Sequence, residues 1–193
     1  MTRDEAYALM TEWTQSENLR KHMLAVEAAM REYARKFGED EEKWAVVGLL
    51  HDMDYEKHPT PEEHPYVAVE YLKKKGVSEE ITRAILSHAE YTGVQPETLM
   101  EKTLRAVDEL CGFITACVYV RPSRSIMDLK VSSVKKKMKQ SGFARAVRRE
   151  DIIQGAELLG ISLEEHIATV IGGMKKAADR LGLAGNSPDD QNS

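Results

Sequence analysis

The sequence has few of the features expected of a membrane, secreted or nucleic-acid-binding protein. Its most extended apolar stretch, Cys111–Val120, is about half as long as a bilayer-spanning helix. The first residues, MTRDEAYALM, lack the basic-then-apolar order of a secretory signal. Its 27 basic residues are outnumbered by 32 acidic ones, whereas a nucleic-acid binder usually has a basic excess. We therefore expect a cytoplasmic protein with no membrane and no nucleic-acid partner.

Cysteine, glycine and proline are also scarce. The two cysteines, Cys111 and Cys117, lie close together in one stretch with helical spacing, and we expect both to be reduced and buried. Only 12 glycines and 6 prolines occur in 193 residues, which argues against a turn-rich all-β fold. The 42% hydrophobic and 31% charged residues are typical of a globular protein, and this length favours one domain.

Apolar residues recur at helical spacing along nearly the whole chain, and no segment alternates with period two. Capping boxes at Thr2/Glu5 and Ser162/Glu165 mark two helix starts, and Gly38 marks a helix end. The sequence therefore predicts an all-α fold. The predicted helices cover residues 2–13, 16–37, 40–51, 62–75, 78–88, 98–120, 151–159 and 162–181, with a basic segment at 130–149.

Four histidines and two aspartates lie where the helical pattern would place apolar side chains. A carboxylate on a buried face costs several kcal/mol unless it is paired or bound to a metal. A single residue of this kind is more often a hydrogen-bonded core residue, but six on inward faces of different helices are harder to explain separately. Imidazole and carboxylate together suit Mn, Fe, Co, Ni or Zn. The six residues are His22, His51, Asp52, His64, His88 and Asp108.

The order of these residues resembles the H…HD…D signature of the HD-domain superfamily of metal-dependent phosphohydrolases. The segments HPYVAVEYL (64–72), AILSHAEYTG (84–93) and LRAVDELCGFITACVYVRP (104–122) are also similar to segments of HD-GYP and related members. The resemblance covers about residues 19–125. It implies an HD-domain helical bundle with a metal centre between helices.

This resemblance also implies a domain organisation. A single HD-type helical domain would cover residues 1–183, with the metal core at about 19–125 and C-terminal helices at 126–183. The polar residues 184–193 would form a disordered tail.

The resemblance implies a ligand set for one or two divalent ions, with Mn, Fe, Co, Ni or Mg as candidates. In single-metal members the ligands would be His22, His51, Asp52 and Asp108. In two-metal members His64 and His88 would hold the second ion and Asp52 would bridge. Because both additional histidines are present, we favour two metals.

Other positions depart from the HD-GYP pattern. The HDIG motif continues here as His51-Asp52-Met53-Asp54, and Tyr55 replaces the lysine that follows it. His88 is followed by alanine rather than by a second histidine, and the GYP triplet is absent. These departures argue against a third metal and against a cyclic-di-GMP substrate.

The predicted activity is hydrolysis of a small phosphorylated compound or nucleotide by a metal-activated water. Asp52 is a predicted catalytic residue, and Asp54, Glu56 or Glu90 would orient the water or protonate the leaving group. Basic side chains would hold the phosphate. The segment 130–149 would either fold over the metal centre and hold an anionic substrate or, as is more common for such a run, form a solvated helix face. The predicted phosphate-binding residues are Lys21, Lys57, Arg121 and Lys135.

Two other functions remain open at this stage. Some HD-fold proteins, resembling inositol oxygenase and organophosphonate oxygenase, use the same ligand set to hold two irons and activate dioxygen. A non-catalytic binding module stabilised by metal is the other alternative, for which His88→Ala would weaken folding without removing any activity. Iron content and oxygen uptake distinguish the oxygenase from the hydrolase.

Overall fold

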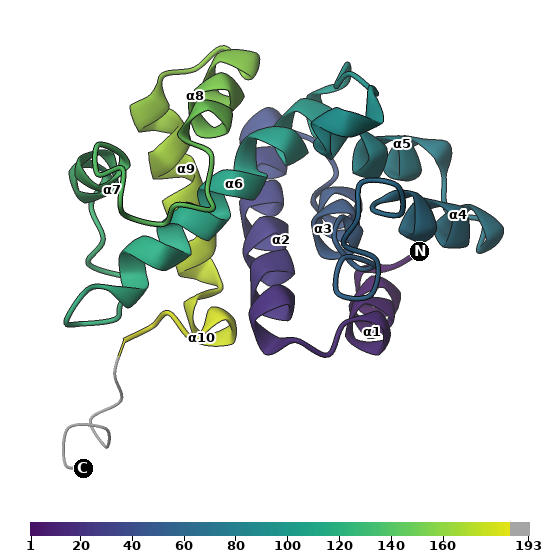
Figure 1. The fold of residues 1–193 in the computed structure, drawn as a ribbon, viewed down its shortest axis with the longest axis horizontal. Helices are drawn as coiled ribbons and strands as arrows, with labels where there is room; N and C mark the ends of the chain where they lie inside the picture. The colour runs from purple at the N-terminus through teal and green to yellow at the C-terminus, as the bar shows by residue number, and fades with distance from the viewer. Residues whose placement is uncertain (186–193) are drawn as a thin grey trace.

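A computed structural model describes residues 1–185, which form helices joined by turns (Figure 1). No strand occurs in this part of the chain, where one isolated bridge pairs Ser125 with Ala184. The predicted all-α class is confirmed. The elements are α1 (Arg3–Trp13), α2 (Glu17–Phe37), α3 (Glu41–Leu50), α4 (Tyr66–Lys74), α5 (Glu79–His88), the 3-10 turn η1 (Glu90–Thr92), α6 (Leu99–Tyr119), α7 (Val131–Met138), α8 (Arg149–Leu158), α9 (Leu163–Lys176) and α10 (Ala178–Leu181).

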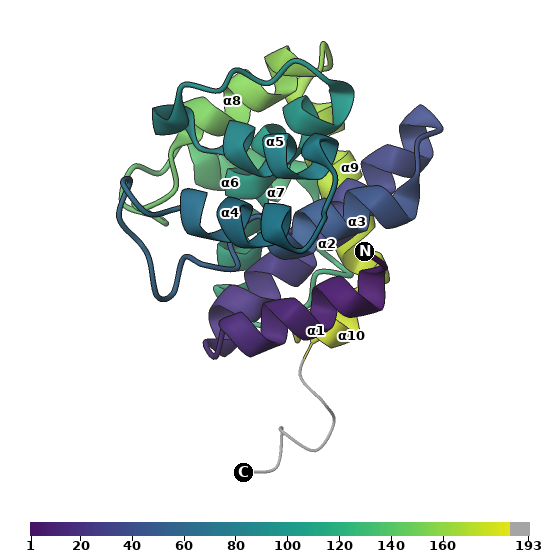
Figure 2. The same cartoon turned by 90° about the vertical axis from the view of Figure 1, so that its right-hand side faces the viewer.

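The long helices α2 and α6 cross at the centre of the fold (Figure 1). Helices α1, α3, α4 and α5 lie on one side of α2, and α7 to α10 lie on the other. Figure 2 shows α4 and α5 side by side, and α5 packs against α6. Because α6 also packs against α8 and α9, it connects the two halves of the molecule.

Most helix boundaries follow from capping residues that the sequence shows. Thr2 and Glu5 form the predicted capping box at the start of α1, and Asp40 accepts hydrogen bonds from the first backbone N–H groups of α3. Gly38 ends α2 at φ 74°, a left-handed conformation that glycine adopts without a steric cost. At the start of α9, Ser162 accepts from the backbone of Glu165.

The predicted helices differ from the observed ones in four details. α4 begins at Tyr66 instead of residue 62, because a proline at 65 disfavours helical geometry in the residue before it. The basic segment contains an additional helix, α7. The last predicted helix breaks at Ala177 into α9 and α10. The Glu165 carboxylate also binds Lys36 rather than completing the capping box.

The core fills the space between these helices, and it includes both cysteines as free, buried thiols, as predicted. Burial raises the pKa of the Cys111 thiol well above its usual range, so this thiol stays protonated. Within residues 1–185, no helix combines the length and the hydropathy that a bilayer-spanning segment requires. The predicted disordered tail falls almost entirely on residues 186–193, outside the described part of the chain.

A buried histidine that is not among the predicted metal ligands joins three helices. His166 of α9 has Nδ1 2.6 Å from the Tyr33 hydroxyl of α2 and Nε2 2.9 Å from the Ala106 carbonyl oxygen of α6. The hydroxyl of Tyr33 therefore donates to Nδ1, and the ring's own N–H donates to the carbonyl. Burial lowers the pKa of His166 to about 4, which keeps the imidazole neutral.

His166 should make the protein less stable as the pH falls. Its pKa is about 4 in the folded chain and about 6.5 for an unperturbed imidazole, so the unfolded chain binds the proton more tightly. The contribution is complete above pH 6.5 and is lost as the pH falls toward 4, for a loss of at most about 3 kcal/mol. We expect His166→Gln to have a smaller pH dependence than the wild type in urea unfolding. Equal pH dependence in the two proteins would show that His166 does not titrate on unfolding.

Candidate metal centre

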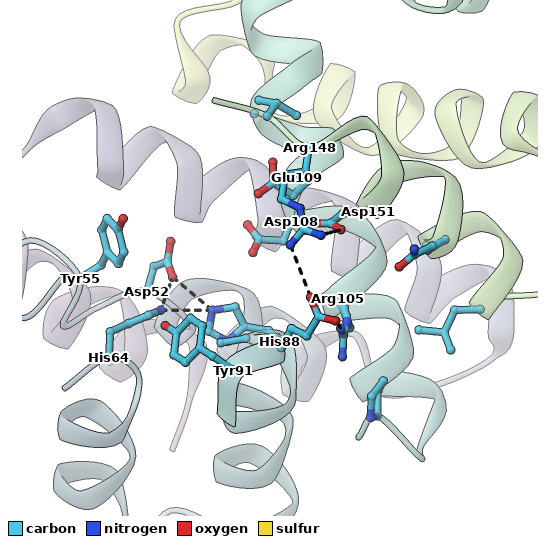
Figure 3. Close-up of a pocket in the computed structure, with 18 of the residues that line it drawn as sticks. Asp52, Tyr55, His64, His88, Tyr91, Arg105, Asp108, Glu109, Arg148 and Asp151 are labelled. Carbon is cyan, nitrogen blue, oxygen red and sulfur yellow. Dashed lines mark hydrogen bonds and ion pairs between the residues drawn. The ribbon is translucent and has the colours of Figure 1, made fainter. Parts of the chain in front are cut away.

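Six polar side chains from five segments converge between α2, α3, α5 and α6. They form two groups that share one carboxylate, Asp52. Figure 3 shows Asp52 between His64 and His88 on one side and Asp108 on the other. The first group is His22, His51, Asp52 and Asp108, and the second is Asp52, His64 and His88.

Close packing of α3 on α2 brings His51 toward His22. A Cβ atom at Gly48 would lie 2.7 Å from the Cα of Glu27, so only glycine allows the two helices this approach. The chain leaves helical geometry after His51. Asp52 follows directly in the turn and projects beside the histidine.

The first group has the donor chemistry of a cation site. His22 Nε2 lies 2.9 Å from Asp108 Oδ1, and His51 Nε2 lies 3.5 Å from an oxygen of both Asp52 and Asp108. His51 donates from Nδ1 to the Gly48 carbonyl oxygen at 2.8 Å. Its Nε2 is buried with no hydrogen-bond partner. A buried nitrogen lone pair facing two carboxylates fits a metal ion, which would satisfy all three groups.

The second group uses the other oxygen of Asp52. Oδ1 of Asp52 lies 3.3 Å from His64 Nε2 and 3.4 Å from His88 Nε2, and the two ring nitrogens lie 3.3 Å apart. Each histidine donates from Nδ1 to a second partner, His64 to Asp54 at 2.7 Å and His88 to the Ile85 carbonyl at 2.5 Å. Both Nε2 lone pairs therefore face Asp52, in a geometry suited to a second ion that shares this carboxylate.

The charges in the centre favour cations. Burial opposes ionisation, but the neighbouring histidines outweigh it and hold the pKa values of Asp52 and Asp108 below their usual range. Burial likewise opposes protonation of His64, yet Asp52 and Asp54 raise its pKa to about 9. Protons and metal ions therefore compete for the same imidazole nitrogens, and metal affinity should rise with pH.

Both groups open onto a cavity of about 1030 Å³ (Figure 3), large enough for a nucleotide-sized molecule. Tyr55 and Tyr91 line it beside His64, and burial raises the pKa of Tyr91 to about 12, so its hydroxyl remains a donor. On the side of Asp108, burial and that carboxylate raise the pKa of Glu109 to about 7. Arg105, Arg148 and Asp151, which Figure 3 also labels, line the cavity as well.

Two of the predicted catalytic carboxylates have other contacts. Asp54 is fully buried, where it accepts hydrogen bonds from His64 and from the backbone N–H of Ala68, so it positions His64 and does not face the cavity. Glu56 accepts from the backbone N–H groups of Gln15 and Ser16 and links the turn after α3 to the start of α2. Of the three alternatives, Glu90 is the one that lines the cavity.

The predicted phosphate-binding residues lie outside the cavity. Arg121 pairs with Asp128 at 2.9 Å, and Lys135 pairs with Glu164. Lys21 lies near Gly182, and Lys57 lies in an exposed turn. None of the four is among the lining residues.

The basic residues that do line the cavity are Arg105 and Arg148. The sequence contained a signal for the first, because Arg105 precedes Asp108 by three residues and so shares a face of α6 with it. Arg148 belongs to the basic segment for which an approach to the centre was one of two alternatives, but the sequence does not distinguish it from its neighbours.

Comparison with known proteins agrees with this geometry. Residues 19–112 match the family model of the HD domain. Residues 19–112 of this chain therefore form an HD domain. The HD match contains all six residues of the two groups. The resemblance to the HD-domain superfamily that the sequence shows is therefore confirmed.

Two curated relatives of this HD protein are each named Ribonuclease Y. The one from Oleidesulfovibrio alaskensis is 31% identical over 98 residues, which cover 50% of this chain and 18% of the relative. The one from Lawsonia intracellularis is 34% identical over 103 residues, which cover 53% and 19%. The HD protein thus spans about a fifth of the length of these relatives. No solved structure gives a significant match.

Asp54→Asn should weaken the second group of the HD domain more than the first. The amide keeps the size of the side chain but removes the charge that holds His64 Nδ1–H, and loss of such a supporting carboxylate costs about 10–100-fold in metal affinity or activity. We expect calorimetric titration with the metal ion to show this loss of affinity at one of the two classes of site. Glu56→Gln serves as the control, and equal weakening of all bound metal in the Asp54 variant would contradict the assignment.

Proposed function

We propose that this HD protein is a metal-dependent phosphohydrolase that acts on a small phosphorylated compound or nucleotide. The observation that carries the proposal is the placement of Asp52, whose two oxygens face two separate groups of histidines at the cavity of about 1030 Å³. An arrangement in which one carboxylate is shared by two cation sites suits phosphate-ester hydrolysis.

In the proposed centre His22, His51, Asp52 and Asp108 would hold one divalent ion, and Asp52, His64 and His88 a second. Bound ions would supply a Lewis acid that lowers the pKa of water and neutralises phosphoryl charge. The chain's own groups fix this arrangement. Backbone carbonyls at Gly48 and Ile85 hold the histidine tautomers, and both aspartates stay ionised.

The cavity walls would bind the remainder of the substrate. The hydroxyl of Tyr91 lines the cavity near His64 as a protonated, potential donor, and Arg105 and Arg148 offer guanidinium donors beside Glu90. Donors placed in this way would orient the part of the substrate that lies beyond the ester phosphate. The cavity volume of about 1030 Å³ would accommodate a nucleotide or a sugar phosphate.

A phosphate-release screen on protein of known metal content tests the proposal. Protein purified anaerobically would be assayed with phosphomonoesters and nucleotides, after chelation and after return of Mn, Co, Ni, Fe or Mg. We expect release that chelation abolishes and at least one metal restores. Two irons per chain with substrate-dependent oxygen uptake would favour the oxygenase instead. Failure to take up any metal would contradict both enzyme functions, whereas metal binding without turnover would favour a binding module.

A second candidate is hydrolysis of RNA phosphodiesters, which the similarity to two proteins named Ribonuclease Y favours. The net charge of −5 argues against a broad nucleic-acid-binding surface. Adding a 5′-labelled single-stranded oligoribonucleotide to the same screen distinguishes the two. Cleavage of the oligonucleotide in preference to mononucleotides would favour this candidate over the small-molecule phosphohydrolase.

A further inference from the structure

Two arginines line the cavity on the wall away from His64 and His88 (Figure 3). Arg105 extends from α6, one helical turn before Asp108, and Arg148 immediately precedes α8. These residues come from segments 43 positions apart in sequence, and the packing of α6 against α8 brings them to one wall. The wall therefore has two guanidinium groups that lie outside the candidate ligand set.

The two arginines share one carboxylate at long distance. Arg148 Nη1 lies 3.4 Å from Glu90 Oε2, and Arg105 Nη2 lies 3.9 Å from Glu90 Oε1. Arg148 also lies 3.4 Å from Asp151. By contrast, the structural Arg3 binds both oxygens of Glu27 at 2.9 and 3.0 Å. The cavity arginines therefore have guanidinium N–H groups that no close acceptor engages.

The loop that carries Arg148 is held in place by its neighbour. The Arg149 guanidinium donates to the backbone carbonyls of Phe143, Ala144 and Val147, the last two at 2.7 and 2.6 Å, and lies over the Phe113 ring of α6. Phe143 packs edge-on against the same ring. This anchoring fixes the backbone at Arg148 relative to α6, so the spacing between Arg148 and Arg105 is built into the fold.

We propose that Arg105 and Arg148 form a second anion subsite, which selects substrates carrying a further phosphate or carboxylate in addition to the phosphate ester. This inference rests on the proposed function for the position of the ester. Glu90 is the internal counter-ion that the substrate anion replaces. Its side chain is 66% exposed, so it moves into water at little desolvation cost. Glu109 and Asp151 lie on the same wall, and their repulsion confines the anion to the place of Glu90.

Calorimetric titration of the metal-loaded protein tests the subsite without any turnover. The probes are α,ω-alkane bisphosphonates of three to six carbons, each compared with the alkylphosphonate of the same length. We expect at least one bisphosphonate to bind about tenfold or more tightly than its partner, the effect of one charge-assisted hydrogen bond. ω-Carboxyalkylphosphonates in the same series distinguish a carboxylate subsite from a phosphate subsite.

Four variants assign the preference to these residues. Arg105→Ala and Arg148→Ala should each bind a bisphosphonate no more tightly than the alkylphosphonate of the same length. Arg145→Ala, in the same loop as Arg148 but outside the cavity, should behave as the wild type. Glu90→Gln should bind the bisphosphonate more tightly than the wild type because the counter-ion is gone. The proposal is overturned if the wild type does not prefer the bisphosphonate to the alkylphosphonate, or if both arginine variants keep that preference. Absence of phosphate release with an intact preference would count against the hydrolase alone.

Discussion

Asp52→Ala is expected to remove bound metal and phosphate release together. Asp52 is the one residue that belongs to both groups of ligands, so its loss removes an anionic donor from each. Loss of a supporting residue costs about 10–100-fold, and a shared ligand should cost more. We expect phosphate release to fall by at least about 1000-fold and elemental analysis to show less than one metal per chain.

A surface aspartate provides the matched control for this experiment. Asp179 of α10 is exposed and lies outside both groups, so Asp179→Ala should retain full metal content and activity. Circular dichroism of both variants shows whether the helices remain. An Asp52 variant that keeps its full metal content would disprove the ligand assignment, whatever its activity.

Gly173→Ala is expected to cause a large loss of stability at the contact between α9 and α2. A Cβ at this position would lie 2.6 Å from the Ala28 carbonyl oxygen and 3.0 Å from the Glu32 Cβ. Relieving that clash requires the two helices to separate. We expect a loss of about 2–3 kcal/mol in the free energy of unfolding, or roughly 5–10 °C in Tm, despite the higher helix propensity of alanine.

The preceding residue shows whether the effect is steric. At Gly172 the nearest atom to an added Cβ is Glu32 Oε1 at 4.0 Å, so Gly172→Ala has room and should be neutral or stabilising by up to about 1 kcal/mol. Thermal unfolding of the two variants under one buffer condition gives the comparison. Equal Tm values for the two alanine variants would mean that α9 adjusts its position without cost.

The sequence predicted the parts of the fold that local chemistry determines. Thr2, Asp40 and Gly38 mark helix ends through their own hydrogen bonds or backbone conformation, so no tertiary information is required. The six candidate ligands were identified because imidazole and carboxylate on inward helix faces conflict with burial unless they act together. The HD-domain family model, which matches residues 19–112, supports the same interpretation.

The charged residues around the cavity could not be identified from the sequence, because charge alone does not show which way a side chain points. Lys135 and Arg148 belong to one basic segment, yet one pairs with Glu164 and the other reaches the cavity. Asp54 and Glu56 follow Asp52 closely, but the turns after α3 direct them to His64 and to backbone N–H groups. These outcomes depend on packing between α6 and α8 and on turn geometry, which helical spacing does not encode.

The anchoring of the α7–α8 loop by Arg149 divides the protein into two parts that can change separately. All six candidate ligands lie within residues 19–112, whereas Arg148 lies beyond them on a loop that the Arg149 guanidinium and the Phe143 ring fasten to α6. Substitutions at residues 144–148 would therefore alter which molecules enter without disturbing the ions. An engineer seeking new substrates for this scaffold would diversify that loop, keep Arg149 and leave α2, α3 and α5 untouched.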